Sequence, residues 1–179
     1  SNLGQLNLHD TLLSGSIPPA LGNLSSLSHL KLYNNALTGS IPTELGGLTN
    51  LQGLSISGNQ LSGSIPAELG NLTNLTYLGL NYNQLSGSIP SELGSLSNLT
   101  GLDLSRNQLS GTIPKELGSL SNLTVLSLYD NALTGLLRSE LGNLTALTEL
   151  RLDNNQLSGS IPAAFSTIPT INVSSNPKL

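Results

Sequence analysis

The side chains best suited to contacting a ligand recur at four positions of a 24-residue repeat. In the first copy these are Gln5, Asn7, His9 and Asp10, and their counterparts follow every 24 residues. The four positions cover 28 of the 179 residues, yet they hold all four tyrosines, both histidines and eight of the charges contributed by six basic and ten acidic residues. Tyrosine gives a large contact area with a polar end, and arginine anchors carboxylates. This enrichment predicts a recognition surface.

We expect thirteen of these side chains to contact the ligand. They are His29, Lys31, Tyr33, Tyr77, Asn81, Tyr82, Asp103, Arg106, Tyr129, Asp130, Glu149, Arg151 and Asp153. The third copy has only Gly and Ser at these positions, which predicts a bare floor between Tyr33 and Tyr77. Such a trough suits a peptide backbone or a sugar ring. The alternative is an ordinary polar surface, because strands favour Tyr in any case and exposed charges pair with each other for about 0–1 kcal/mol.

The residue types argue against catalysis and against several classes of partner. The chain has no cysteine and two histidines, and no nucleophile, base and orienting group recur together. No phosphate-binding glycine loop or metal-ligand spacing is present, so we expect no enzyme, no cofactor and no metal. A net charge of −4 disfavours nucleic acid. No apolar run reaches the roughly 18 residues of a membrane span.

These side chains must be positioned by a solenoid, because the whole chain repeats at a fixed period. Leu3 and Gly15 recur every 24 residues as far as Leu147 and Gly159, and Asn35 recurs as far as Asn155. The sequence therefore predicts one domain over residues 1–179. It has seven repeats from Leu3 to Thr170 and a shortened terminal repeat over residues 171–179.

The fourth copy shows how one repeat is expected to fold. Alternating side chains predict a strand over residues 77–80, which would lie in a parallel sheet with neighbours about 4.8 Å apart. Asn83 follows the strand, where its amide can satisfy unpaired backbone groups of the turn. Gly87 suits a tight bend. Pro90 at a first helical position, with Glu92 in the first turn, predicts a short helical or 3₁₀ segment.

The recurring pattern LxxLxxLxLxxNxLxGxIPxxLGxL resembles the plant-type leucine-rich repeat of receptor-kinase ectodomains and polygalacturonase-inhibiting proteins. The resemblance implies an α/β repeat fold: a right-handed solenoid with a concave parallel sheet, an extra short strand near LxGxIP, and 3₁₀, helical or loop segments on the convex side. It also implies ligand recognition, although the family shares no single ligand.

Three departures from the pattern carry expectations of their own. Residues 136–138 read Leu-Leu-Arg where other copies have Ile-Pro, so this flank should be irregular. Ile171, Val173 and Asn176 match the repeat three residues early. Cysteine-paired caps are absent, so partners, flanking domains or end-to-end self-association should cover the ends.

Seven Asn-x-Ser/Thr sequences indicate a glycosylated protein that is secreted or on the extracellular face of the cell surface. Duplication of one Asn-Leu-Thr would produce several of them without any glycan, and a cytoplasmic protein stays open. The candidate acceptors are Asn23, Asn71, Asn74, Asn98, Asn122, Asn143 and Asn172.

Two further functions compete with recognition of a protein, peptide or glycan. Two rows of Ser and Thr, one containing Ser86 and the other Ser88, repeat in nearly every copy and break at Leu136. Hydroxyls repeated at about 4.8 Å could order water, as in an ice-binding protein. A structural scaffold at the cell surface or in the matrix is the other alternative.

Overall fold

The computed structural model describes residues 2–179 as a stack of coils built from parallel strands and 3₁₀ helices. Each coil contributes one strand to an eight-stranded parallel sheet, in chain order. The strands of this first sheet are β1 (Gln5–Asn7), β3 (His29–Lys31), β5 (Gly53–Ser55), β7 (Tyr77–Gly79), β9 (Gly101–Asp103), β11 (Val125–Ser127), β13 (Glu149–Arg151) and β15 (Thr170–Asn172). The expected strand over residues 77–80 is confirmed to within one residue.

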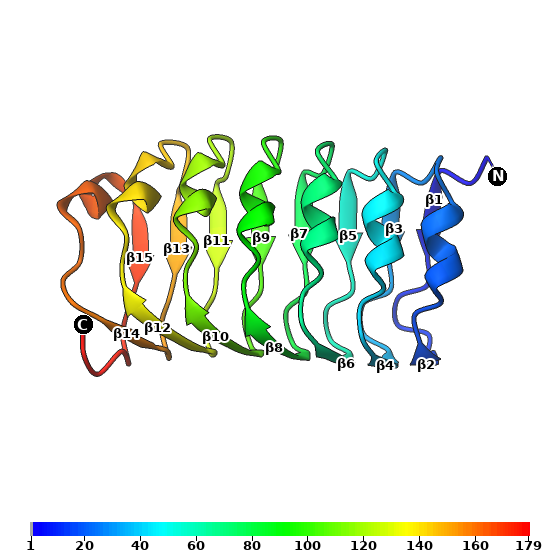
Figure 1. The fold of residues 1–179 in the computed structure, drawn as a ribbon, viewed down its shortest axis with the longest axis horizontal. Coiled ribbons are helices and arrows are strands. Elements are labelled where there is room, and N and C mark those ends of the chain that lie inside the picture. The colour runs from blue at the N-terminus through cyan, green and yellow to red at the C-terminus, as the bar shows by residue number, and fades with distance from the viewer. Residues whose placement is uncertain (1) are drawn as a thin grey trace.

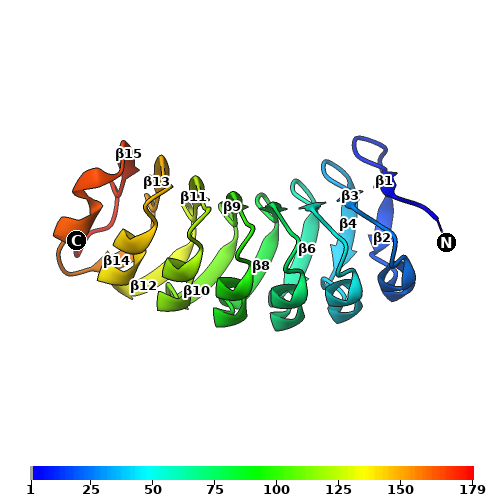
Figure 2. The ribbon, with the colours of Figure 1, turned by 90° about the horizontal axis from the view of Figure 1, so that it is seen from above.

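A second, seven-stranded parallel sheet lies along the flank, and 3₁₀ helices cover the back. The flanking strands are β2 (Ser14–Ser16), β4 (Ala36–Gly39), β6 (Gln60–Gly63), β8 (Gln84–Ser88), β10 (Gln108–Thr112), β12 (Ala132–Leu136) and β14 (Gln156–Ser158). The helices are η1 (Pro19–Asn23), η2 (Thr43–Gly47), η3 (Ala67–Asn71), η4 (Ser91–Ser95), η5 (Lys115–Ser119), η6 (Ser139–Asn143) and η7 (Ala163–Thr167). The stack is one coil thick (Figure 1) and curves with the first sheet on its concave side and the helices on its convex side (Figure 2).

The core is a continuous column of aliphatic side chains inside the coils. In the fourth coil Leu78, Leu80, Leu85 and Leu93 are fully buried. Gly70 of η3 faces the next helix so closely that a Cβ would lie 2.5 Å from the Glu92 carbonyl oxygen. The glycine in each Leu-Gly pair therefore lets neighbouring helices touch.

The predicted asparagine ladder is present at the turn that follows each strand of the first sheet. Asn83 is 9% exposed. Its Nδ2 donates to the carbonyl of Ile56 in the preceding coil at 3.1 Å and to that of Leu80 in its own coil at 3.1 Å. Its Oδ1 accepts from the backbone N–H of Leu61 at 3.0 Å. One side chain thus joins two coils and leaves none of these backbone groups unpaired.

The two sheets differ in register, which changes one expectation. In the first sheet residue i faces residue i+24, as Tyr77 faces Gly101. In the second sheet residue i faces i+22, so Ser88 faces Ser110 while Ser86 faces Gln108. Equivalent hydroxyls are therefore shifted by two residues as well as by one strand, a separation of about 8 Å. The expected 4.8 Å spacing along each hydroxyl row is wrong.

The helix starts also differ in detail from the expectation. Pro90 occupies the N-cap, with φ −64° and ψ 133°, and is not the first helical residue. Glu92 lies in the first turn as expected, where its charge complements the helix N-terminus.

The expected irregularity of the sixth coil is absent from the backbone. Strand β12 and helix η6 have the same lengths as their neighbours, and Arg138 takes the N-cap conformation of the usual proline, with φ −79° and ψ 135°. Leu137 replaces the usual isoleucine in the core at 6% exposure, whereas Leu136 is 59% exposed. The departure is therefore confined to side chains.

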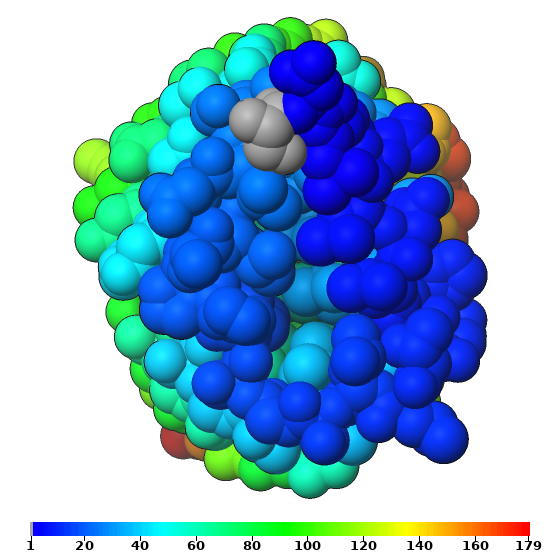
Figure 3. Space-filling view, turned by 90° about the vertical axis from the view of Figure 1, so that its right-hand side faces the viewer, coloured from blue at the N-terminus to red at the C-terminus, as the bar shows by residue number. Residues whose placement is uncertain are grey.

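The two ends of the described chain are covered to different extents. At the C-terminal end Asn176 accepts the N–H of Leu157 at 3.0 Å, which continues the ladder three residues early as expected. Gly159 N–H donates to the Lys178 carbonyl at 2.9 Å, and Leu179 packs against the core. At the N-terminal end Leu3 and Leu8 are about 40% exposed, and Figure 3 shows atoms of the second coil between the two sides of the first.

We predict that Asn83→Ala lowers the free energy of unfolding by about 2 kcal/mol or more, because buried backbone groups of two coils lose their partner. Thermal and urea unfolding followed by circular dichroism measures the loss. Asn71→Ala is the matched control, since Asn71 is exposed on η3. Melting of the Asn83 variant within a degree of the control would contradict the role assigned to the ladder.

Candidate ligand-binding face

The outward positions form columns across the concave sheet and the turns beside it. The first two positions of each coil lie in the strands of the first sheet. The third and fourth, such as Asn81 and Tyr82, follow the strand, which is one refinement of the sequence expectation. The fourth has a left-handed backbone in every coil, with φ +55° at Tyr82 and +52° at Arg106.

The N-terminal part of this face is built around stacked rings. His9 and Tyr33 stack with centroids 4.4 Å apart and planes 9° apart. The His9 ring nitrogen also lies 2.8 Å from the Asp10 carboxylate, and this hydrogen bond, followed by that of Asn34, holds the pKa of Asp10 below its ordinary value. Lys31 is half-buried on β3.

The expected trough between two aromatic walls is only partly present. A Cβ on Gly53 would lie 2.9 Å from Cδ2 of His29, so the histidine ring covers part of the glycine floor. Tyr33 stacks toward the first coil, and Tyr77 reaches toward β9, so the two rings lean away from the third coil. Asn81 accepts a hydrogen bond from Ser57. The floor is therefore bare at Ser55 and Gly58 alone.

Tyr77 lies flat over the glycines of its own and the next strand. A Cβ on Gly79 would lie 2.8 Å from Cε1 of Tyr77, and one on Gly101 would lie 2.9 Å from its Cδ2. The ring is nevertheless 42% exposed. Burial raises the pKa of Tyr77 above 10.0, and the charge of Asp103 raises it further.

A hollow of about 250 Å³ adjoins this ring on the concave face. Its floor and walls come from β7, β9 and β11 and the residues before them: Tyr77, Thr100, Gly101, Leu102, Asp103, Thr124, Val125 and Ser127. Asp103 is held in place because its Oδ1 accepts the N–H of Ser105 at 3.0 Å and its hydroxyl at 2.6 Å. The sequence did not reveal the part played by Ser105, whose side chain is buried.

The C-terminal half of the face contains two arginines that stack on tyrosines. The Arg151 guanidinium lies 3.8 Å from the Tyr129 centroid and donates through Nε and Nη2 to Asp153, at 3.3 and 3.0 Å. This hydrogen bonding raises the pKa of Arg151 above its ordinary value. Glu149 is half-buried on the same strand as Arg151.

Arg106 repeats this arrangement one coil earlier. Its guanidinium lies 4.6 Å from the Tyr82 centroid and 5.8 Å from that of Tyr129. Its Nε lies 3.2 Å from Oδ2 of Asp130. Tyr82, Arg106, Tyr129 and Arg151 thus form one alternating stack along the edge of the sheet.

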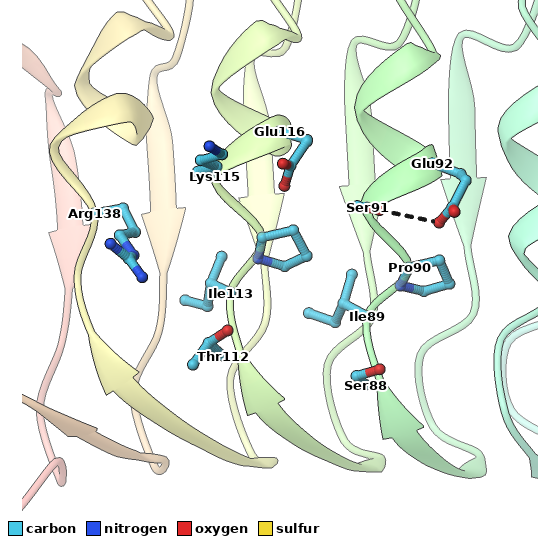
Figure 4. A pocket seen from close by; sticks show the side chains of 11 residues that line it. Ser88, Ile89, Pro90, Ser91, Glu92, Thr112, Ile113, Lys115, Glu116 and Arg138 are labelled. Carbon is cyan, nitrogen blue, oxygen red and sulfur yellow. Dashed lines mark hydrogen bonds between the residues drawn. The ribbon is translucent and has the colours of Figure 1, made fainter.

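Larger hollows lie on the flank, between the second sheet and the 3₁₀ helices. The one in Figure 4 has a volume of about 540 Å³, and Ile89, Pro90 and Ile113 lie between the Ser88–Thr112 edge and the charged ends of η4 and η5. Similar hollows recur in earlier coils. They repeat the consensus residues, so they carry little of the variable chemistry.

The glycosylation candidates fall into three structural groups. Nδ2 of Asn74, Asn98 and Asn122 donates at 2.8 Å to a carbonyl of the preceding coil. Asn50 makes the same bond without being part of a glycosylation sequence, so this column has a structural role. Asn172 lies in β15. The exposed acceptors with no side-chain hydrogen bond to any described residue are Asn23, Asn71 and Asn143.

Two properties of residues 2–179 bear on other classes of site. No group of three or more His, Cys, Asp or Glu side chains in this range is placed to hold a metal ion. No helix in this range is long and apolar enough to cross a membrane.

Comparison with known families identifies the class of protein that this fold defines. The family model described as "Leucine-rich repeat region" matches residues 58–167, and "Leucine rich repeat" matches residues 1–61. The chain therefore belongs to the leucine-rich repeat family, in its plant-type form. No curated protein matches it.

Solved structures of plant receptors resemble the chain closely. The ectodomain of the Arabidopsis thaliana receptor kinase GASSHO1/SCHENGEN3, in complex with CASPARIAN STRIP INTEGRITY FACTOR 2, is 47% identical with a TM-score of 0.91 over 93% of this chain and 20% of that one. The Arabidopsis receptor kinase HAESA, in complex with the peptide hormone IDA and the co-receptor SERK1, is 38% identical with a TM-score of 0.89 over 96% and 30%. A plant ice-binding protein is 34% identical with a TM-score of 0.87 over 95% and 56%. This chain thus spans about a fifth to a third of the receptor ectodomains.

We predict that Tyr77 titrates at higher pH than the other three tyrosines, and that Asp103→Asn lowers its pKa without restoring 10.0, because burial is the larger cause. Absorbance at 295 nm between pH 8 and 12, with Tyr77→Phe to assign the transition, measures this. Stability due to neutral Tyr77 is present below pH 10 and is lost as the pH rises through its folded pKa. An unchanged Tyr77 transition in Asp103→Asn would mean that the two side chains do not interact.

Proposed function

We propose that this chain is a recognition module that binds an extended peptide or protein segment along its concave face. The observation that carries the proposal is the concentration of ordered, solvent-facing Tyr and Arg side chains on the first sheet and its turns. Tyr77 and Tyr82 are 42% and 48% exposed, although large aromatic side chains are usually buried. The chain would act by binding and not by catalysis.

The similar structures support this ligand class. Those of GASSHO1/SCHENGEN3, HAESA and RGFR1 are described with a bound peptide hormone or factor. Because this chain spans a minor part of those ectodomains, its ligand must be established directly. An extracellular setting follows from the same similarity, with Asn23, Asn71 and Asn143 as the glycan acceptors of choice because their amides are free.

We predict that Tyr77→Ala combined with Tyr82→Ala weakens peptide binding by about 2 kcal/mol or more, roughly 30-fold, because central aromatic anchors dominate interface energies. The probe is a displayed library of random peptides selected on the intact chain, with affinities of the selected peptides measured by calorimetry. A glycan array run in parallel distinguishes a sugar ligand.

The matched control carries Glu68→Gln and Glu92→Gln at the helix starts of η3 and η4, on the convex side. It should bind the selected peptides as the parent does. A larger loss in this control than in the tyrosine variant would move the site off the concave face.

Ice binding is a second candidate, favoured by the exposed hydroxyl rows and by the 34% identical ice-binding protein. The i to i+22 register pairs hydroxyls across strands, as in Ser88 with Ser110 and Thr112 with Thr134. If these pairs bind ice, Ser88→Tyr with Thr112→Tyr should abolish inhibition of ice recrystallisation, since bulky rings disrupt the surface. Absence of inhibition by the parent chain would remove this candidate.

A further inference from the structure

Two groups of Tyr, Arg and Asp on this face share one arrangement. Arg151 lies 3.8 Å from the Tyr129 centroid and 3.0 Å from a carboxylate oxygen of Asp153. Arg106 lies 4.6 Å from the Tyr82 centroid and 3.2 Å from a carboxylate oxygen of Asp130. In each group a guanidinium stacks on a ring while its N–H groups donate to a carboxylate. Arginine suits this role because its planar charge can do both at once.

A third tyrosine and aspartate lie together on the same face without an arginine. Tyr77 and Asp103 line one hollow, and the strands pair Tyr77 with Gly101 and Gly79 with Asp103. Ser105 holds Oδ1 of Asp103, while Oδ2 has no hydrogen bond to a described residue. The ion pairs among residues 2–179 are His9–Asp10, Arg106–Asp130 and Arg151–Asp153, so none of them includes Asp103.

The surrounding chain does not bring a cation to this hollow. The outward neighbours across the strands are small: Gly53 and Gly101 beside Tyr77, and Gly79 and Ser127 beside Asp103. Lys31 shares the Asp103 column but lies three strands away, roughly 14 Å at the usual strand spacing. Arg151, two strands away, has its Nε and Nη2 engaged by Asp153.

We propose that the hollow beside Tyr77 and Asp103 binds an arginine side chain of the peptide ligand, an inference that rests on the proposed function. The guanidinium stacks on the exposed face of Tyr77 and donates to Oδ2 of Asp103, which completes the third group. Leu102 and Val125 supply apolar wall for the methylene stem. The 250 Å³ hollow accommodates one such side chain. Lysine is a weaker ligand, because an ammonium does not stack as a plane.

Nuclear magnetic resonance titration of the ¹⁵N-labelled chain tests the proposal with single amino-acid probes in place of the peptide. The probes are Nα-acetyl-arginine methylamide and its citrulline counterpart, which keeps a planar polar end but carries no charge. The arginine probe should shift the amides of Gly101, Asp103 and Ser105, with an affinity about tenfold or more above that of citrulline. Asp103→Asn should remove this preference, and Glu92→Gln should leave it intact.

The tyrosine variants separate stacking from a general structural effect. Tyr77→Phe keeps the ring and should bind the arginine probe within about twofold of the parent, whereas Tyr77→Ala should lose most of the shift. Equal shifts with citrulline, or arginine shifts that persist in Asp103→Asn, would overturn the assignment.

The peptide library distinguishes this failure from failure of the proposed function. Selected peptides that need Tyr77 should be enriched in arginine, and the enrichment should disappear on Asp103→Asn. Peptides that need Tyr77 without any arginine preference would overturn the arginine site and leave concave-face recognition intact. A library without any concave-face binder would overturn both.

Discussion

The backbone turn after each concave strand is the constraint on which the rest of this structure depends. A parallel sheet of three-residue strands must turn sharply, and the turn leaves carbonyl and N–H groups inside the stack, away from water. Asn83 and its equivalents satisfy these groups in two coils at once, through donors and an acceptor on one short side chain. Aspartate lacks the donors, and serine or threonine lacks the reach. The fixed period of 24 residues is the consequence, because a coil of another length would move its amide out of register.

This constraint also decides where variable chemistry can be placed. The asparagines hold the first sheet in the i to i+24 register, so equivalent outward side chains stand beside each other in columns. Columns allow a ring in one coil to meet a guanidinium in the next, as Tyr82 meets Arg106. The second sheet slips to i+22, so equivalent residues there are not direct neighbours. Recognition chemistry assembled from several coils therefore belongs on the concave face.

Much of the fold follows from the sequence because the repeat reports the same physics seven times. Leucine spacing indicates the buried side of each coil, and the Asn and Gly columns indicate its turns. The early Asn176 correctly indicated the shortened last coil. Side-chain directions could not be predicted in the same way. The sequence placed Tyr77 and Tyr33 as walls of a trough, but each ring packs on its nearest available surface, which is Gly101 in one case and His9 in the other. The slip of the second sheet could not be predicted either, because the letter pattern has one period whatever the pairing.

The edge of the concave face contains conformations that folding stability alone does not explain. Left-handed φ angles are ordinary for Asn34 and Gly58 but unfavourable for Tyr82 and Arg106, by about 1 kcal/mol or more each. The stacking of these two side chains offsets about 0.5–1 kcal/mol, and the exposed pair of Arg106 with Asp130 contributes about 0–1 kcal/mol. The sum is close to zero, so asparagine at both positions would serve the fold as well. A tyrosine and an arginine in adjacent coils, each half-exposed at an unfavourable backbone position, are instead explained by contact with a molecule outside the chain.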